Sequence, residues 1–170
     1  ENLDLYAFWT SDYCTVTLIN SANLSEKLEK KVGKGSKQRL NDIYWQATEY
    51  GSKEIFTTPA YYHREGFAKT ADATENDSAS WSAIAITEDQ TWYQLWSIQV
   101  IGHYGWYWDD AKTNESQNYC TYFYGQAITD PSEKYGTPWR DHYTFTRWYS
   151  DRECTTPATF PLSVSDAVKD

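Results

Sequence analysis

The sequence predicts an α+β protein in which N-terminal strands and one or two helices pack on an antiparallel β-sheet, in a single domain spanning residues 1–170. Helix-period apolar spacing is confined to residues 24–50, whereas β-branched and period-two runs precede and follow it. Separation of helices from strands along the chain is typical of α+β folds. A length of 170 residues allows one sizeable core but not two independent ones.

The N-terminal part is expected to hold two short strands, at residues 3–10 and 13–19, that form a hairpin or meander. A short helix is predicted at residues 24–32, where Leu24, Leu28 and Val32 recur every four residues. A second helix is predicted between Ser36 and Tyr50, from apolar residues spaced i, i+3, i+4 and i+7: Leu40, Ile43, Tyr44 and Ala47.

The C-terminal part is expected to supply most of the sheet. Residues 70–78 are a polar loop, and strands are predicted at 81–87, 91–101, 119–128 and 142–149. The longest of these strands alternates, with Trp96, Ile98 and Val100 on one face and Ser97 and Gln99 on the other. The tail at 155–170 is expected to be extended and loose.

The charge is uneven. The chain carries a net charge of −9, yet the segment from Glu26 to Arg39 is basic. An acidic body with one basic segment argues against polyanion binding by the whole surface and leaves room for a local phosphate-facing site. A solvated helix face would have the same composition.

Several features predict a secreted, extracellular glycoprotein. The chain starts at Glu1 and contains no methionine, as expected after removal of a signal peptide, although an engineered start would give the same result. Three Asn-X-Ser sequons predict glycosylation at Asn23, Asn76 and Asn114. No apolar run is long enough to predict a membrane span, and we expect a monomer.

The three cysteines, Cys14, Cys120 and Cys154, allow one disulfide and one remaining thiol, or an intermolecular link. Their spacing is not that of a zinc site, so neither a metal nor a cofactor is expected. Disulfide mapping would distinguish a Cys14–Cys120 bridge from a Cys14–Cys154 bridge.

The segment that ends the long strand is the best-placed candidate for function. His103 follows Gly102 and precedes Gly105, and glycines let a ligand approach the backbone. Tyr104, Trp106 and Trp108 next to it could stack on bases or sugars, or fill the core.

Three local motifs carry a resemblance to a known family. They are Tyr13-Cys14, Tyr61-Tyr62-His63-Arg64-Glu65-Gly66-Phe67 and Val100-Ile101-Gly102-His103-Tyr104-Gly105, and Asn118-Tyr119-Cys120 falls where the closing cysteine of that family would lie. In these motifs the chain resembles the small secreted fungal guanyl-specific ribonucleases and the ribonuclease-like effectors of powdery mildew fungi.

The resemblance implies a ribonuclease-like fold closed by a Cys14–Cys120 disulfide. It also implies that His63 assists the base, with Glu65 beside it, and that His103 is the general acid. Tyr62 and Arg64 would then bind the substrate. The chain departs from the family where Ser80 precedes Trp81 in place of the glutamate base, and where Gln90 or Thr91 stands in place of the arginine.

We therefore expect a ribonuclease-like effector that is catalytically weakened or inactive and acts by binding RNA or a host protein. One alternative is an active endoribonuclease that forms 2′,3′-cyclic phosphates. Another is a β-barrel of the lipocalin type, whose aromatic side chains would line a cavity for a small hydrophobic ligand. A glycan-binding domain is a further alternative.

Overall fold

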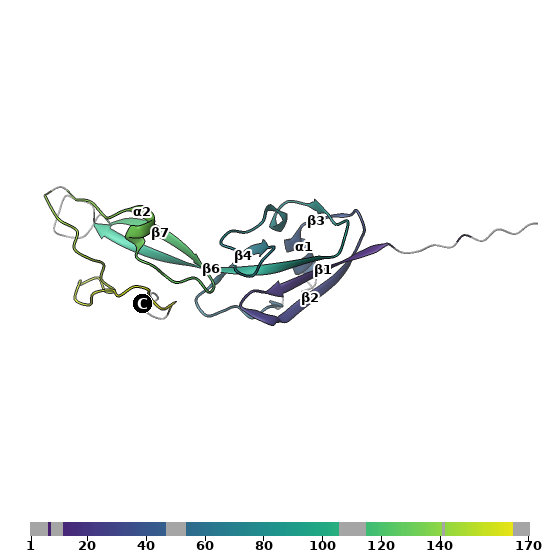
Figure 1. Ribbon diagram of the computed structural model, residues 1–170, viewed down its shortest axis with the longest axis horizontal. Coiled ribbons are helices and arrows are strands. Elements are labelled where there is room, and N and C mark those ends of the chain that lie inside the picture. Colours follow the sequence, from purple (N-terminus) through teal and green to yellow (C-terminus); the bar gives the residue numbers. More distant parts are fainter. Residues whose placement is uncertain (1–6, 8–11, 47–53, 106–114, 141, 165–170) are drawn as a thin grey trace, which may run out of the picture. The chain divides into compact units, whose positions relative to one another are not determined.

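Strand β6 (Gln90–Gly105) is the longest element of the structure and the strand on which the main sheet is built. The computed structural model describes residues 7, 12–46, 54–105, 115–140 and 142–164. The sheet has five strands in the order β2-β1-β6-β4, and β7 also pairs with β6 (Figure 1). Together with two short α-helices this makes an α+β fold, as predicted.

The chain divides into two compact units, each described here by itself. Unit 1 contains residues 1–57 and 65–95, and unit 2 contains residues 58–64 and 96–170. Strand β6 contributes its first residues to unit 1 and the rest to unit 2.

Strands β1 (Tyr13–Asn20) and β2 (Asn23–Gly33) form the N-terminal hairpin of unit 1. The helix predicted at 24–32 is wrong, because this segment is the edge strand β2. A spacing of four residues also fits a strand, whose side chains share a face at every second position. Leu28 pairs with Leu18, and Val32 with Cys14, so the hairpin contacts override the local helical propensity.

The sheet is mixed, not antiparallel as predicted, because β1 runs parallel to β6 with Leu18 opposite Trp92. Helix α1 (Leu40–Gln46) confirms the second predicted helix from Leu40 to Gln46. Its predicted start at Ser36 is wrong, because residues Lys37–Gln38 form a strand. Tyr44 on α1 packs against the rings of Phe56 and Phe67, with centroids 5.5 and 6.1 Å away.

The middle of the chain surrounds this core with short elements. They are β3 (Lys37–Gln38), β4 (His63–Ala68), the 3₁₀ helix η1 (Ser78–Ser80) and β5 (Ile84–Ala85), which pairs with β3. The strand predicted at 81–87 is wrong except at β5. The Asp77 side chain accepts a hydrogen bond from Ala79 N–H at 2.8 Å and so starts a helical turn, and Trp81 is exposed.

Unit 2 is built on the antiparallel ladder of β6 with β7 (Glu115–Phe123), which runs from Ser97 opposite Phe123 to Gly105 opposite Glu115. Helix α2 (Pro131–Tyr135) follows β7 and was not predicted. No strand forms over the described part of 142–149, where only isolated bridges occur. In the C-terminal tail, Leu162 N–H donates a hydrogen bond to the Ile128 carbonyl, so this part of the tail contacts the segment that follows β7.

Some predictions fall outside the described residues. These are nearly all of the strand at 3–10, the helix beyond Gln46 and the last residues of the tail. Within the described part of the chain, no helix has both the length and the apolar character needed to cross a membrane.

Candidate functional site

The three residues predicted to be catalytic lie on two strands. His63 and Glu65 are two positions apart on β4 and therefore lie on one face of that strand, with Arg64 on the other. His63 is exposed, whereas Glu65 is half-buried. His103 is exposed on β6, opposite Gln117 of β7.

The two histidines belong to opposite ends of the β6–β7 ladder. Tyr62, which precedes His63, packs its ring on Tyr124 with centroids 5.3 Å apart. Tyr124 N–H donates to the Trp96 carbonyl at 2.9 Å, so this contact lies where the ladder begins. His103 is seven residues beyond Trp96, about 23 Å along an extended strand. The structure therefore does not bring the two imidazoles to one phosphate, as acid and base catalysis requires.

The predicted binding residues are also less available than the sequence suggested. Tyr62 is only 9 % exposed, and burial raises the pKa of its hydroxyl. Arg64 is half-buried. Trp106 and Trp108, and the side chain of Tyr104, lie outside the described part of the structure.

The cysteines are free thiols, so the predicted Cys14–Cys120 bridge is not formed in the structure. Cys14 is buried in unit 1, Cys120 is buried in unit 2, and Cys154 is exposed. Burial raises the pKa of the Cys120 thiol. No group of three or more histidine, cysteine or acidic residues suitable for a metal ion occurs among the described residues.

The sequons differ in their surroundings. Asn23 is exposed at the start of β2, where its Nδ2 donates to Glu26 Oε1 at 3.0 Å. Asn76 is half-buried, and Asn114 lies outside the described residues.

The part of unit 2 that does present binding chemistry is a set of exposed aromatic side chains near α2, interleaved with cations. Trp139 is 73 % exposed and Tyr143 62 %. Tyr135, at the end of α2, is also exposed, and its hydroxyl donates to the Tyr119 carbonyl at 2.7 Å. We refer to this set as the aromatic-cationic strip: Tyr119, Lys134, Tyr135, Trp139, Arg140 and Tyr143.

The two cations of the strip lie over aromatic rings. Arg140 Cζ is 4.0 Å from the centroid of the Tyr143 ring. Lys134 Nζ is 5.7 Å from the centroid of Tyr135. Cation–π contacts of this kind attract a positive charge to the face of an aromatic ring. The arrangement presents flat apolar surfaces and neighbouring positive charges together.

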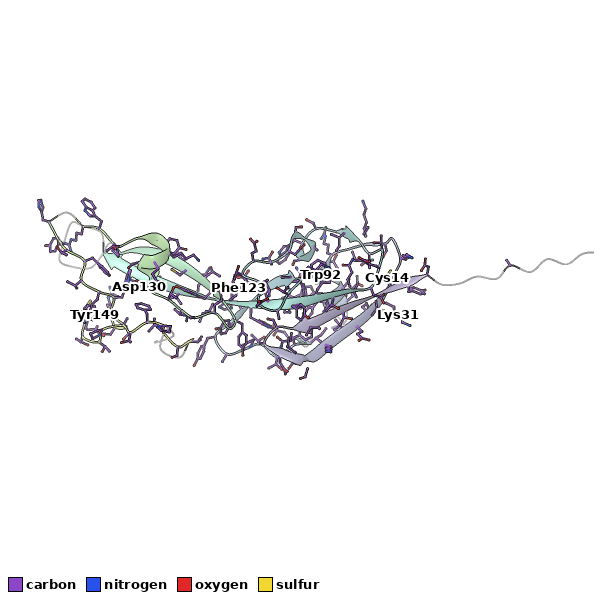
Figure 2. The ribbon with its side chains drawn as sticks, viewed as in Figure 1. Cys14, Lys31, Trp92, Phe123, Asp130 and Tyr149 are labelled. Atoms are coloured by element: carbon purple, nitrogen blue, oxygen red, sulfur yellow. The ribbon has the colours of Figure 1, made fainter. Side chains whose placement is uncertain are left out.

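Hydrogen bonds at the start of α2 hold the helix that carries Lys134 and Tyr135 of the strip. Asp130, labelled in Figure 2, precedes the helix and accepts from Ser132 N–H at 2.7 Å. Trp148 Nε1 donates to Asp130 Oδ1 at 3.0 Å and to Ser132 Oγ at 2.9 Å, which ties a later segment to the helix start. Gly136, at φ 81°, ends the helix directly after Tyr135.

Sequence patterns did not reveal this strip because its residues are spread over β7, a short unpredicted helix and an irregular segment. The motif Tyr135-Gly136-Thr137-Pro138 indicates a break, and residues from His142 onward alternate like a strand. The available signal was compositional, since Trp139, Arg140 and Tyr143 lie within five residues of one another.

Comparisons with known proteins give no further assignment. The chain matches no protein-family model, no curated protein and no solved structure.

Proposed function

We propose that this protein binds single-stranded RNA through the aromatic-cationic strip and does not cleave it. The observation that carries the proposal is the grouping of exposed rings with cations: Lys134 lies over Tyr135 and Arg140 over Tyr143, and the highly exposed Trp139 directly precedes Arg140. We also propose that the protein is secreted and acts as an effector, as expected from its sequence.

The chemistry of the strip fits a flexible polyanion with planar bases. Unpaired bases stack on aromatic side chains, and each such contact contributes about 1–3 kcal/mol by alanine substitution. Lysine and arginine next to the rings would contact the phosphates between stacked bases. Because the protein as a whole carries −9, binding must depend on this local surface and not on net charge.

The positions of the histidines support binding over cleavage. Cleavage of RNA at the 2′-hydroxyl needs a base and an acid on opposite sides of one phosphate. His63 and His103 belong to opposite ends of the β6–β7 ladder, so neither has the other as its partner in catalysis. The strand order also argues against the lipocalin-type alternative. In the described residues β2 and β4 lie at the two ends of the sheet and do not pair with each other, whereas a barrel with an internal cavity needs its terminal strands to pair.

The test is fluorescence anisotropy with a labelled single-stranded RNA of about 12 nucleotides, a length within the usual range of such sites. Trp139→Ala and Tyr143→Ala should each raise the Kd by about 5- to 150-fold, the equivalent of one lost stacking contact. Trp81→Ala is the matched control, because Trp81 is 59 % exposed but lies in unit 1. It should leave the Kd within about twofold.

The same RNA, recovered after incubation, tests for cleavage. We expect it to remain intact, with wild-type protein and His103→Ala giving the same background. Failure of the wild-type protein to bind RNA, or equal binding by the wild type and both strip variants, would exclude this function. Cleavage that His103→Ala abolishes would show the protein to be an active ribonuclease.

A further inference from the structure

Strand β2 is the terminal strand of the main sheet and has an open outer edge. Its inner edge pairs with β1, from Lys27 opposite Ile19 to Gly33 opposite Tyr13 (Figure 1). No strand of the described residues pairs with its outer edge. An edge of 11 residues presents backbone N–H and C=O groups that can add another strand.

Residues at equal distances on either side of Leu28 in the middle of β2 carry opposite charges. Residues 26–30 read Glu-Lys-Leu-Glu-Lys, so the sequence read backwards places an acid where the forward sequence has a base. If a second copy pairs antiparallel with Leu28 opposite Leu28, then Lys27 lies opposite Glu29 and Glu26 lies opposite Lys30. Opposite charges across an antiparallel pair are stabilising, and like charges are destabilising.

The exposure of the side chains agrees with this register. Lys27 and Glu29 are both exposed, whereas Glu26, Leu28 and Lys30 are half-buried on the other face. Directly opposite residues of an antiparallel pair share a face, so each charge meets its complement on its own side of the extended sheet. A register centred on Glu29 would instead set Lys27 opposite Lys31. The charge pattern therefore selects one register.

Glu26 carries the negative charge that this register sets opposite Lys30 of a second copy. Its oxygens accept hydrogen bonds from Asn20, Asn23 and the Thr57 N–H, which lower its pKa and keep it ionised. Asn23, the sequon residue of β2, lies five residues from Leu28 and therefore outside the charge pairs formed by residues 26–30.

We propose that β2 is a self-recognition edge, on which a second copy of this chain adds antiparallel about Leu28 to form a symmetric dimer. Lysines on an edge strand commonly prevent pairing with other strands. In β2 the lysines and glutamates are ordered so that their charges complement those of β2 in a second copy of this chain, whereas most other strands would not match them. The dimer differs from the monomer expected from the sequence, and it does not depend on RNA binding by unit 2.

The test is sedimentation velocity of the intact chain over a concentration series. Wild-type protein should dimerise, whereas Lys27→Glu and Glu29→Lys should each weaken dimerisation at least about tenfold, because each puts two like-charged pairs across the interface. The two variants mixed together should form a heterodimer, since every 27–29 pair then has opposite charges. The double variant Lys27→Glu with Glu29→Lys should restore the homodimer for the same reason.

Charge-matched controls separate this effect from net charge. Lys37 on β3 and Glu75 in the loop before η1 are exposed and lie outside β2, so the variants Lys37→Glu and Glu75→Lys should both dimerise like the wild type. A wild-type protein that stays monomeric throughout would overturn the proposal. So would a dimer that both single variants retain, or a mixture of the two that forms no heterodimer.

Discussion

Glu26 is a carboxylate that joins three segments of unit 1. Its Oε2 accepts hydrogen bonds from Asn20 Nδ2 and from Thr57 N–H, both at 2.7 Å, and its Oε1 accepts from Asn23 Nδ2 at 3.0 Å. These donors, Asn20 foremost, lower the pKa of Glu26 from 4.5 to about 2, against the opposing effect of desolvation. The ionised form is therefore part of the folded structure.

Replacing Glu26 by glutamine should lower the free energy of unfolding by about 1–2 kcal/mol at neutral pH, because charge-assisted hydrogen bonds become neutral ones or are lost. Folding lowers this pKa, so the stabilisation is present above pH 4.5 and is lost as the pH falls toward 2. Denaturant unfolding at several pH values, at concentrations low enough to keep the protein monomeric, measures the difference.

The gap between Glu26→Gln and the wild type should close as the pH falls through this range. The control Glu75→Gln, at an exposed loop position, should change stability by less than about 0.5 kcal/mol. A gap that does not depend on pH would mean that the carboxylate charge has no part in the effect.

Single residues also show why the candidate site could not be predicted in full. The strand before His103 was predictable, because period-two alternation identifies a strand locally. The predicted strand ended at residue 101, however, whereas β6 continues through His103 to Gly105 because these residues pair with β7. The distance of His103 from His63 was not predictable, because that depends on which end of the β6–β7 ladder the segment before β4 contacts. The strip around Trp139 was missed because its residues lie on β7, on a short helix and on an irregular segment. The hydrogen bonds from Trp148 to Asp130 and Ser132, which hold the start of that helix, have no local signature.

At the scale of elements, β1 and β6 were predictable and β2 was not. β1 and β6 consist largely of β-branched and aromatic residues in alternation, which favours strands. β2 contains lysine, glutamate and leucine, which are good helix formers, so only its pairing with β1 decides its state. The parallel pairing of β1 with β6 joins segments about 70 residues apart. The sequence pattern of neither segment indicates which strand it pairs with.

Gly66 allows β4 and η1 to approach closely. A Cβ at this position would lie 2.9 Å from Ser80 Oγ, which accepts from Phe67 N–H at 2.8 Å and donates to the Phe67 carbonyl. Gly66→Ala should therefore displace Ser80 and cost about 1–3 kcal/mol in the free energy of unfolding.

Gly33→Ala is the matched control for Gly66→Ala. Gly33 ends β2, and a Cβ there would have no atom within 4 Å, so stability should change by less than about 0.5 kcal/mol. Denaturant unfolding of both variants measures the difference. Equal stability of the two would show that β4 and η1 are not tightly packed at Gly66.

At the scale of the whole molecule, the two units carry separate proposals. Unit 1 presents the charge-complementary edge of β2, and unit 2 presents the aromatic-cationic strip. The acidic net charge of −9 makes non-specific attraction to RNA weak, so bound RNA should be found at the strip and not across the surface. The sequence allowed either a phosphate-facing site or a solvated face for the basic segment at 26–39; the part of it on β2 is here proposed to be an edge for a second copy.

Ultraviolet crosslinking of single-stranded RNA to the intact protein, followed by mass spectrometry of the crosslinked peptides, tests whether RNA binds at the aromatic-cationic strip. We expect crosslinks within residues 131–143, at Trp139 and Tyr143 above all, that disappear in the Trp139→Ala and Tyr143→Ala double variant. Crosslinks confined to the lysines of β2, or no crosslinks from the wild-type protein, would contradict this proposal.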